Sequence, residues 1–167
     1  MEENKVFLEN LDFAEFVLEK WQIKVRSLEL KNQVGNKNMT DPIADMLNRI
    51  KNAQTVNHIT VKVPFSKAKN DIAKILKEKC FIEDFSTKQK KQEKVLEIVL
   101  KYIDGEPRIT GVKRVSKPGQ RIYTPVLRIQ KVRSGYGLMI VSTSQGIVTG
   151  DEARKNNTGG EIICEIW

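Results

Sequence analysis

The sequence has few of the residues from which metal and disulfide sites are built. Among its 167 residues it holds one histidine, His58, and two cysteines, Cys80 and Cys164, that lie far apart and outside any CxxC pair. One chain therefore cannot assemble a four-ligand Cys/His zinc site. Because an unpaired cysteine behaves as a small apolar side chain, we expect both thiols to be free and buried. We expect neither a metal nor a cofactor.

Long hydrophobic runs are also missing. No apolar run approaches the roughly 20 residues that a membrane-spanning helix requires. The opening segment MEENKVFLENLDFAEF is acidic, and it lacks the basic start and apolar core of a signal peptide. Hydrophobic residues make up 40% of the sequence and charged residues 30%, as in globular proteins. We therefore expect a cytoplasmic protein with no membrane partner.

Motifs for catalysis are incomplete. Ser144 precedes Gly146 by two residues, as in half of a GxSxG elbow, but Ser142 stands where the first glycine is needed. His58 is the one imidazole that could act as a base, and it opens a predicted strand in the other half of the chain. The segment GYGLMI lacks the third glycine of a dinucleotide fingerprint, and no P-loop pattern occurs. The sequence therefore predicts a protein that is not an enzyme.

Positive charge is concentrated in the second part of the chain. The formal net charge is +8. Residues 1–38 hold six Lys and Arg against seven Asp and Glu, whereas residues 39–167 hold 23 against 14. A basic excess of this size favours a polyanionic partner, most often a nucleic acid. The alternative is a basic surface that serves only solubility.

Residues 1–38 have the pattern of an N-terminal extension. Apolar side chains recur at helical spacing over residues 1–30, on a face formed by Phe7, Leu11, Ala14, Leu18 and Trp21. This pattern predicts an amphipathic helix, and KNQVGNKN, residues 31–38, predicts a polar linker. We expect the helix to pack on its own domain or on a neighbour, because membrane-surface helices usually have a basic polar face. Met39 is a second plausible initiator.

Residues 39–105 predict a small α+β domain with the order α-β-α-β-β. The first helix is capped by Thr40 or Asp41, and the second by Ser66. HITVKVPF alternates like a half-buried strand, and FIEDFST and KVLEIVLKYI predict two more. The basic run KQKKQEK, residues 88–94, is predicted to be a solvated hairpin loop between them. Contact of this run with phosphate is the alternative.

Residues 106–167 predict a mainly β domain with one short helix. Strands are predicted over ITGVKRVS, LMIVSTS, GIVT and GEIICEIW, and the helix over GDEARKNN. KPGQ has Pro then Gly in the order of a type II turn. The predicted fold class is therefore α+β, with two small domains after the extension.

The segment that closes the chain has the chemistry of a binding loop. Ser142, Thr143 and Ser144 each offer a hydroxyl that both donates and accepts hydrogen bonds. Such groups suit phosphates, ribose 2′-hydroxyls and base edges in the shallow minor groove of RNA. The glycine pair that ends at Gly160 allows close backbone approach. Glu161 would repel phosphate unless it accepts hydrogen bonds, so it is a candidate for specificity. An ordinary polar turn between strands is an equal alternative.

Several motifs together resemble one protein family. VSTSQGIVTGDEARKNNTGGEIICEIW resembles the C-terminal signature of the bacterial small-subunit ribosomal protein eight family, and TDPIADMLNRIKNA resembles its N-terminus. FIEDF, LKY and RVSKPGQRIY resemble its middle. The resemblance covers residues 39–167 in the family's order, and residues 1–38 match nothing in it.

The resemblance implies a two-domain α+β protein of the small ribosomal subunit. It implies direct binding to a helical junction in the central domain of 16S rRNA, and assembly of the subunit platform. It further implies a monomer beside small-subunit proteins five and twelve, and repression of its own operon mRNA. The RNA contacts that the matching motifs imply are Ser142, Thr143, Ser144, Gly160 and Glu161, then Ser66, Lys67, Tyr123, Asp41 and Thr40.

Two details of that resemblance bear on single residues. Tyr123 could stack on a base or a ribose, or be a half-buried strand tyrosine. Phe65 stands where the family has a small residue before Ser66 and Lys67. A different class of function, a protein-interaction module whose amphipathic extension docks a partner, is the alternative to RNA binding.

Overall fold

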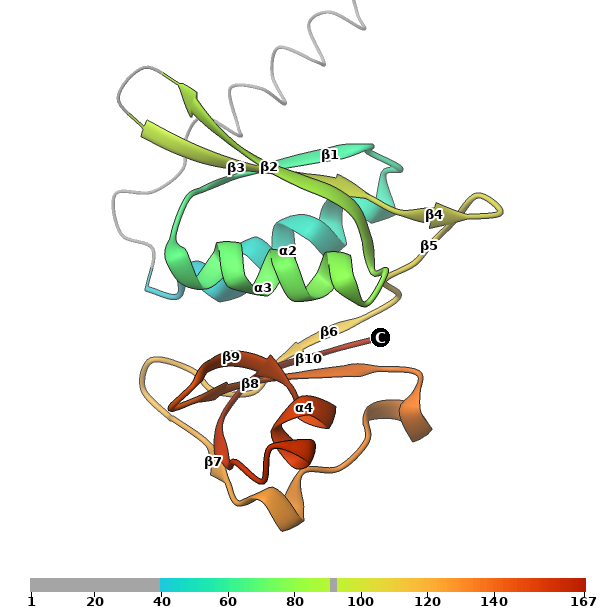
Figure 1. Ribbon diagram of the computed structural model, residues 1–167. Coiled ribbons are helices and arrows are strands. Elements are labelled where there is room, and N and C mark those ends of the chain that lie inside the picture. The colour runs from blue at the N-terminus through green and yellow to red at the C-terminus, as the bar shows by residue number, and fades with distance from the viewer. Residues whose placement is uncertain (1–39, 91–92) are drawn as a thin grey trace, which may run out of the picture. The chain divides into compact units, whose positions relative to one another are not determined.

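The computed structural model describes residues 40–90 and 93–167, and Figure 1 shows their arrangement. The predicted N-terminal helix and its linker, residues 1–38, lie outside the described residues. Within those ranges, no helix has the length and apolar character that crossing a bilayer requires. The same ranges contain no cluster of three or more His, Cys, Asp and Glu side chains that could hold a metal ion.

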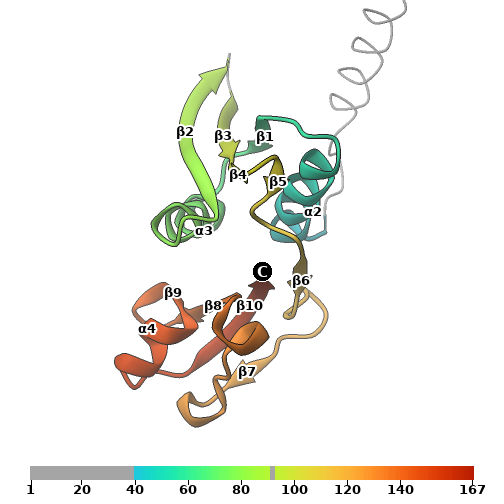
Figure 2. The same cartoon turned by 90° about the vertical axis from the view of Figure 1, so that its right-hand side faces the viewer.

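The first half has the predicted order of two helices and three strands. These elements are α2 (Pro42–Thr55), β1 (Thr60–Pro64), α3 (Lys67–Glu78), β2 (Ile82–Lys90) and β3 (Glu93–Leu100). The strands form an antiparallel sheet in the order β1-β3-β2. Figure 2 shows both helices on one side of this sheet. The α-β-α-β-β prediction is confirmed.

Local capping sets the start of both helices. The Asp41 carboxylate accepts hydrogen bonds from the backbone N–H groups of Ile43 and Ala44, at 3.0 and 3.1 Å. The Ser66 hydroxyl accepts one from the N–H of Lys69 at 3.3 Å. These bonds satisfy N–H groups that have no partner inside the helix. Ser66 caps its helix as predicted, and of the two residues predicted for the first cap, Asp41 is the one that the structure uses.

The basic run at residues 88–94 is not the predicted hairpin loop. Strands β2 and β3 continue into it, with Lys88 opposite Val95 and Lys90 opposite Glu93. Residues 91–92 lie outside the described residues. Lys88 also forms an ion pair with Glu97 across the ladder, so part of this charged segment is paired within the sheet.

The second half is mainly β with one α-helix, as predicted. A short hairpin, β4 (Tyr102–Ile103) and β5 (Glu106–Pro107), leads into it. Its main sheet has the order β6-β10-β8-β9, and β7 also pairs with β10. The elements are β6 (Val112–Arg114), β7 (Tyr123–Thr124), η1 (Val126–Arg128), η2 (Val132–Gly135), β8 (Leu138–Thr143), β9 (Gly146–Thr149), α4 (Gly150–Lys155) and β10 (Gly160–Ile166).

The KPGQ turn forms, but it is not type II. Lys117 and Gln120 face each other across it. Type II requires a positive φ at the third residue, and in the described chain Gly119 is not among the glycines with positive φ. Pro118 fits the second position of a type I turn equally well, so the sequence pattern alone did not separate the two types.

Both halves contribute to one hydrophobic cluster. Helix residues such as Met46 and Ile72 pack with Ile98 of the first sheet and with Ile140 and Ile166 of the second, all of them fully buried. The predicted boundary between two domains at residues 105–106 stays a prediction. The other face of the second sheet carries a smaller cluster under α4 and the two 3-10 turns, made of Ile129, Val132, Met139, Val141 and Ala153.

The two cysteines differ in environment. Cys164 is fully buried in β10, as predicted. Cys80 is exposed, so its predicted burial is wrong. It follows the end of α3 in a left-handed conformation, with φ 58°, and its N–H donates to the Lys77 carbonyl at 3.0 Å. A residue in this turn projects away from the helix face that packs in the core.

Candidate nucleic-acid interface

Three neighbouring strands place three of the predicted site residues in one row. In the register of the sheet, Glu161 of β10 lies opposite Ser142 of β8 and opposite Tyr123 of β7. Directly opposed residues on antiparallel strands project from the same face of a sheet. By the same alternation, Ser142 shares its face with Ile140, which packs in the core with the helices. These three residues, Tyr123, Ser142 and Glu161, form the polar row. The polar row therefore continues the core-facing side of the sheet out to the molecular surface.

The serine-rich segment splits between strand and turn. Thr143 pairs with Gly146, and its hydroxyl donates to the Gly146 carbonyl at 3.0 Å and accepts from the Gln145 N–H at 3.2 Å. The Thr143 hydroxyl is therefore committed to closing the hairpin. Ser144 is exposed at the tip, and no residue in the described ranges hydrogen-bonds its hydroxyl. Gly146 has φ 125°, a conformation that favours glycine.

The glycine pair lets the strands approach each other. A Cβ added to Gly160 would lie 2.2 Å from the carbonyl oxygen of Ser142. A Cβ added to Gly159 would lie 2.7 Å from the carbonyl oxygen of Thr124. Both glycines therefore bring the start of β10 against β8 and β7. The close backbone approach that the sequence suggested occurs within the protein, and the RNA contact of Gly160 stays a prediction.

Glu161 has a basic partner that sequence reasoning missed. Arg121 Nη1 lies 2.8 Å from Glu161 Oε1, and the side chains are 47% and 17% exposed. The hydrogen bond to Glu161 raises the pKa of Arg121 above its ordinary value. The pair places an arginine beside the carboxylate, which offsets the repulsion that Glu161 alone would exert on phosphate. Arg121 precedes Tyr123 by two residues. That spacing is the only sequence signal that Arg121 lies in the same place as Tyr123.

Tyr123 is 71% exposed. The alternative of a half-buried strand tyrosine is therefore wrong. An exposed phenol ring at the edge of a polar row has a free face for stacking on a base or a ribose. Its role in RNA binding stays a prediction.

Both carboxylate oxygens of Asp41 accept hydrogen bonds within the protein. One carboxylate oxygen caps α2, and the other accepts a hydrogen bond from Arg114 Nε at 2.9 Å. Arg114 also donates to the backbone carbonyl of Ile163 in β10. Burial alone would raise the pKa of Asp41, but hydrogen bonds from Ala44 and Arg114 hold it below its ordinary value. Asp41 thus ties the start of α2 to the second sheet, and exposed Thr40 lies beside it.

Ser66 and Lys67 stand at the start of α3. The Ser66 hydroxyl is used as the helix cap, whereas Lys67 is exposed. Figure 1 shows the starts of α2 and α3 and the β8–β9 turn toward the same side of the molecule. The N-terminus of a helix carries partial positive charge, which favours anions. Of this pair, Lys67 is the exposed residue, and its contact with RNA stays a prediction.

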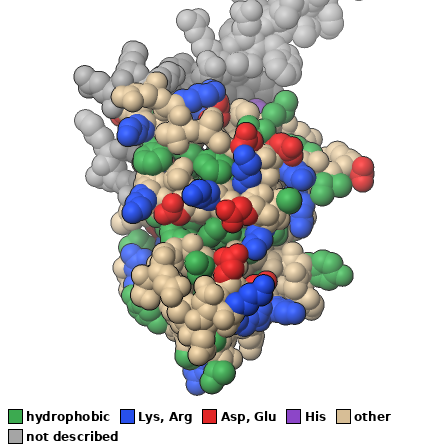
Figure 3. Space-filling model, viewed as in Figure 1, with side chains coloured by type: hydrophobic (Ala, Val, Ile, Leu, Met, Phe, Trp, Pro, Cys, Tyr) green, Lys and Arg blue, Asp and Glu red, His purple; other side chains and the backbone are tan. Residues whose placement is uncertain are grey.

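Charge on one face of the molecule is mixed. On the face drawn in Figure 3, Lys and Arg side chains are interspersed with Asp and Glu side chains. Several lysines on the first half are held by carboxylates, for example Lys62 by Glu97 at 3.5 Å and Lys77 by Asp84 at 2.6 Å. On this face, basic side chains are therefore mixed with acidic ones and do not form one continuous basic patch.

Comparison with known proteins gives a consistent result. The sequence model of the family described as Ribosomal protein S8 matches residues 41–167. The small ribosomal subunit protein uS8 of Nitratidesulfovibrio vulgaris strain Miyazaki F is 51% identical over 129 residues, which cover 77% of this chain and 99% of that protein. The proteins of the same name from Clostridioides difficile and Geobacillus kaustophilus are 49% and 50% identical over 130 residues, covering 77% of this chain and 98% of each.

Proposed function

The chain belongs to the ribosomal protein S8 family, and on that premise we propose that it binds the central domain of 16S rRNA directly and helps to assemble the platform of the small subunit. Membership itself gives the protein a structural, non-enzymatic role in the small ribosomal subunit, in association with rRNA and other ribosomal proteins. In bacteria that role is cytoplasmic.

The row of Tyr123, Glu161 and Ser142 is the observation that carries the proposal. It presents an aromatic ring, a carboxylate and a hydroxyl side by side on three strands. Ser142 and Ser144 can exchange hydrogen bonds with ribose 2′-hydroxyls and base edges in an RNA minor groove. Glu161 can accept from a base amino group or a 2′-hydroxyl. These groups read the shape and edges of RNA, and they supply specificity.

Affinity for phosphate comes from separate residues. Arg121 stands beside Glu161 and is nearly half exposed, and Lys67 is exposed at the start of α3. Each phosphate that a cation neutralises releases counterions, so binding weakens as salt rises. The proposed interface therefore combines a salt-sensitive part with a hydrogen-bonding part that depends less on salt.

Two further roles rest on the resemblance to the family. We propose that small-subunit proteins five and twelve are neighbours of this chain in the ribosome. We also propose that an mRNA structure resembling the rRNA junction binds the polar row and represses translation of the protein's own operon.

The test is binding of the full chain to a central-domain rRNA fragment across a salt series, with excess tRNA as competitor. We expect saturable binding that survives tRNA and weakens with salt. Ser144→Ala should lose about 1–3 kcal/mol on the rRNA fragment only. Lys67→Ala should weaken binding to every RNA and reduce the salt slope by about 1. Binding that tRNA erases completely would contradict the proposal.

A further inference from the structure

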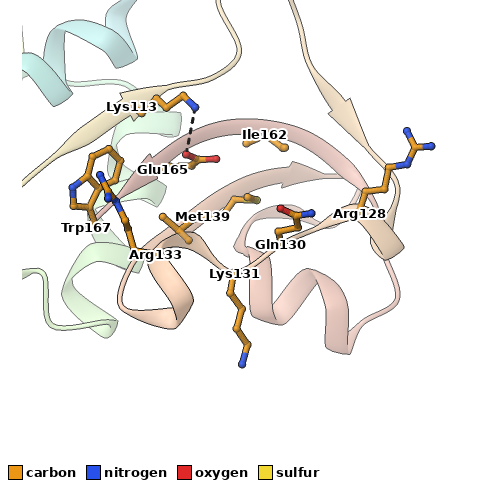
Figure 4. A pocket seen from close by; sticks show the side chains of 10 residues that line it. Lys113, Arg128, Gln130, Lys131, Arg133, Met139, Ile162, Glu165 and Trp167 are labelled. Atoms are coloured by element: carbon orange, nitrogen blue, oxygen red, sulfur yellow. Dashed lines mark ion pairs between the residues drawn. The ribbon is translucent and has the colours of Figure 1, made fainter.

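A second concave site lies on the opposite face of the same sheet. Ile162 follows Glu161 along β10, so its side chain projects from the other face. There a pocket of about 460 Å³ opens over Met139 and Ile162. Figure 4 shows these two apolar side chains between Arg133 and Trp167 at one end and Arg128 at the other. Sequence reasoning assigned no role to this face.

A planar cation and an aromatic ring form one wall of the pocket. The Arg133 guanidinium carbon lies 4.9 Å from the centre of the Trp167 ring. Trp167 is fixed by backbone hydrogen bonds with Gly111 in both directions, at 2.9 and 3.0 Å. A Cβ on Gly111 would lie 2.4 Å from the indole, so the ring packs directly on that glycine. The wall is therefore held in place by the end of β10.

The loop that carries Arg133 is held in an unusual conformation. Arg133 and Ser134 both have left-handed backbones, with φ of 48° and 56°. Two consecutive non-glycine residues in this region are uncommon, and such positions cluster at ligand sites. Gly135, with φ 103°, completes the loop. This backbone places the Arg133 guanidinium over the indole.

The rim of the pocket is positive. Lys113 lies 3.9 Å from Glu165, which partly offsets its charge. Arg128 and Lys131 are exposed and form no ion pair within residues 40–90 and 93–167. Figure 4 shows their charged ends reaching outward from the rim. The site thus combines an apolar floor, a planar cationic wall and cations with no carboxylate partner.

We propose that this pocket binds an unpaired nucleotide of RNA. The base lies over Met139 and Ile162 against the plane of Arg133, and the flanking phosphates meet Arg128 and Lys131. Unpaired bases commonly stack on aromatic rings and arginine planes, with cations along the backbone. This inference rests on the proposed RNA-binding function and adds a single-stranded contact on the face away from the polar row.

The composition of the pocket favours RNA over an acidic peptide. A peptide carboxylate needs the cations but has no use for a flat guanidinium–indole wall. The side chains of Gln130 and Glu165 line the same pocket and offer both donor and acceptor groups for the edge of a base. Phosphate charge alone would not require the apolar floor.

Trp167 fluorescence gives a readout local to the pocket. The sequence has two tryptophans, so Trp21→Phe leaves Trp167 as the sole indole in an otherwise complete chain. We expect short single-stranded oligoadenylate to change this fluorescence saturably and to bind more weakly as salt rises. Lys131→Ala should weaken binding severalfold and lower the salt slope by about 1. Lys51→Ala, which removes an exposed lysine of α2 outside the pocket, is the matched control and should change binding less.

Two further measurements separate the alternatives. Arg133→Lys keeps the charge but removes the plane, so it should weaken oligoadenylate binding severalfold. No saturable change with oligoadenylate, or unchanged binding in Arg133→Lys, would overturn the proposal. A polyglutamate peptide that binds as tightly as RNA would also overturn it. Ser144→Ala should leave oligoadenylate binding intact, so loss of this site and loss of the rRNA interface are distinguishable.

Discussion

Replacing Gly160 with alanine should disrupt the junction of β10 with β8. The added methyl would lie 2.2 Å from the Ser142 carbonyl oxygen, about 1 Å inside ordinary contact distance. The obstacle is the backbone of Ser142, which is paired with Glu161 on one side and with Ile147 on the other, so a side-chain rotation cannot relieve it. The strands have to separate where Glu161 faces Ser142. The polar row would then lose its geometry together with its hydrogen bonds.

The expected loss in the free energy of unfolding has two contributions. Overpacking a tight site costs about 1–3 kcal/mol, and each ladder hydrogen bond lost costs about 0.5–1.5 kcal/mol. Gly160→Ala should therefore lower the free energy of unfolding by roughly 2–4 kcal/mol. With a urea m-value of about 2 kcal/mol/M, the midpoint should fall by about 1–2 M. Urea unfolding followed by circular dichroism measures this shift directly.

Gly119→Ala is the matched control. A Cβ there meets no atom within 4 Å, and Gly119 has no positive φ, so the change should stay within about 0.5 kcal/mol of the parent protein. At a temperature where both variants are folded, Gly160→Ala should also lose binding to the central-domain rRNA fragment, and Gly119→Ala should keep it. Equal urea midpoints for the two variants would refute the packing role given to Gly160.

Three other predictions concern stability and reactivity. Asp41→Asn keeps a helix cap but removes the charge paired with Arg114, so it should cost about 1.5–3 kcal/mol at pH 6. Because the folded pKa of Asp41 is lowered, that difference should shrink as pH falls below about 4, seen in urea midpoints between pH 3 and 7. Thr149→Ala removes a capping box and should cost about 1 kcal/mol in the same assay. Burial raises the pKa of Cys164 to about 12, so iodoacetamide at pH 8 should label only exposed Cys80 until urea unfolds the protein, as mass spectrometry would show.

Local signals in the sequence were enough to predict the helices and most strands. Asp41 and Ser66 cap their helices through residues two or three positions away, so the pattern is contained in a few letters. Alternation likewise predicted β1, where Val61 and Val63 are buried. The resemblance of the closing segment to one family was also confirmed, because several motifs occur in the same order.

Contacts between distant segments could not be predicted in this way. Arg121 and Glu161 are 40 positions apart, and Asp41 and Arg114 are 73 apart, so only the tertiary fold brings each pair together. The need for glycine at position 160 could not be predicted for the same reason, because the carbonyl oxygen that Gly160 approaches belongs to another strand. The sequence identified Tyr123, Ser142 and Glu161 as separate candidates. Only the pairing of the strands shows that these three residues lie in one row.

The central claim is that the polar row selects its RNA, and Glu161 tests it most directly. The measurement is the affinity of Glu161→Gln for the central-domain rRNA fragment and for a random RNA of equal length, at one salt concentration. If Glu161 accepts hydrogen bonds from a base or a 2′-hydroxyl, the variant should lose about 1–3 kcal/mol on the rRNA fragment and little on random RNA. Equal losses on both RNAs, or no loss on the rRNA fragment, would contradict selection by this row.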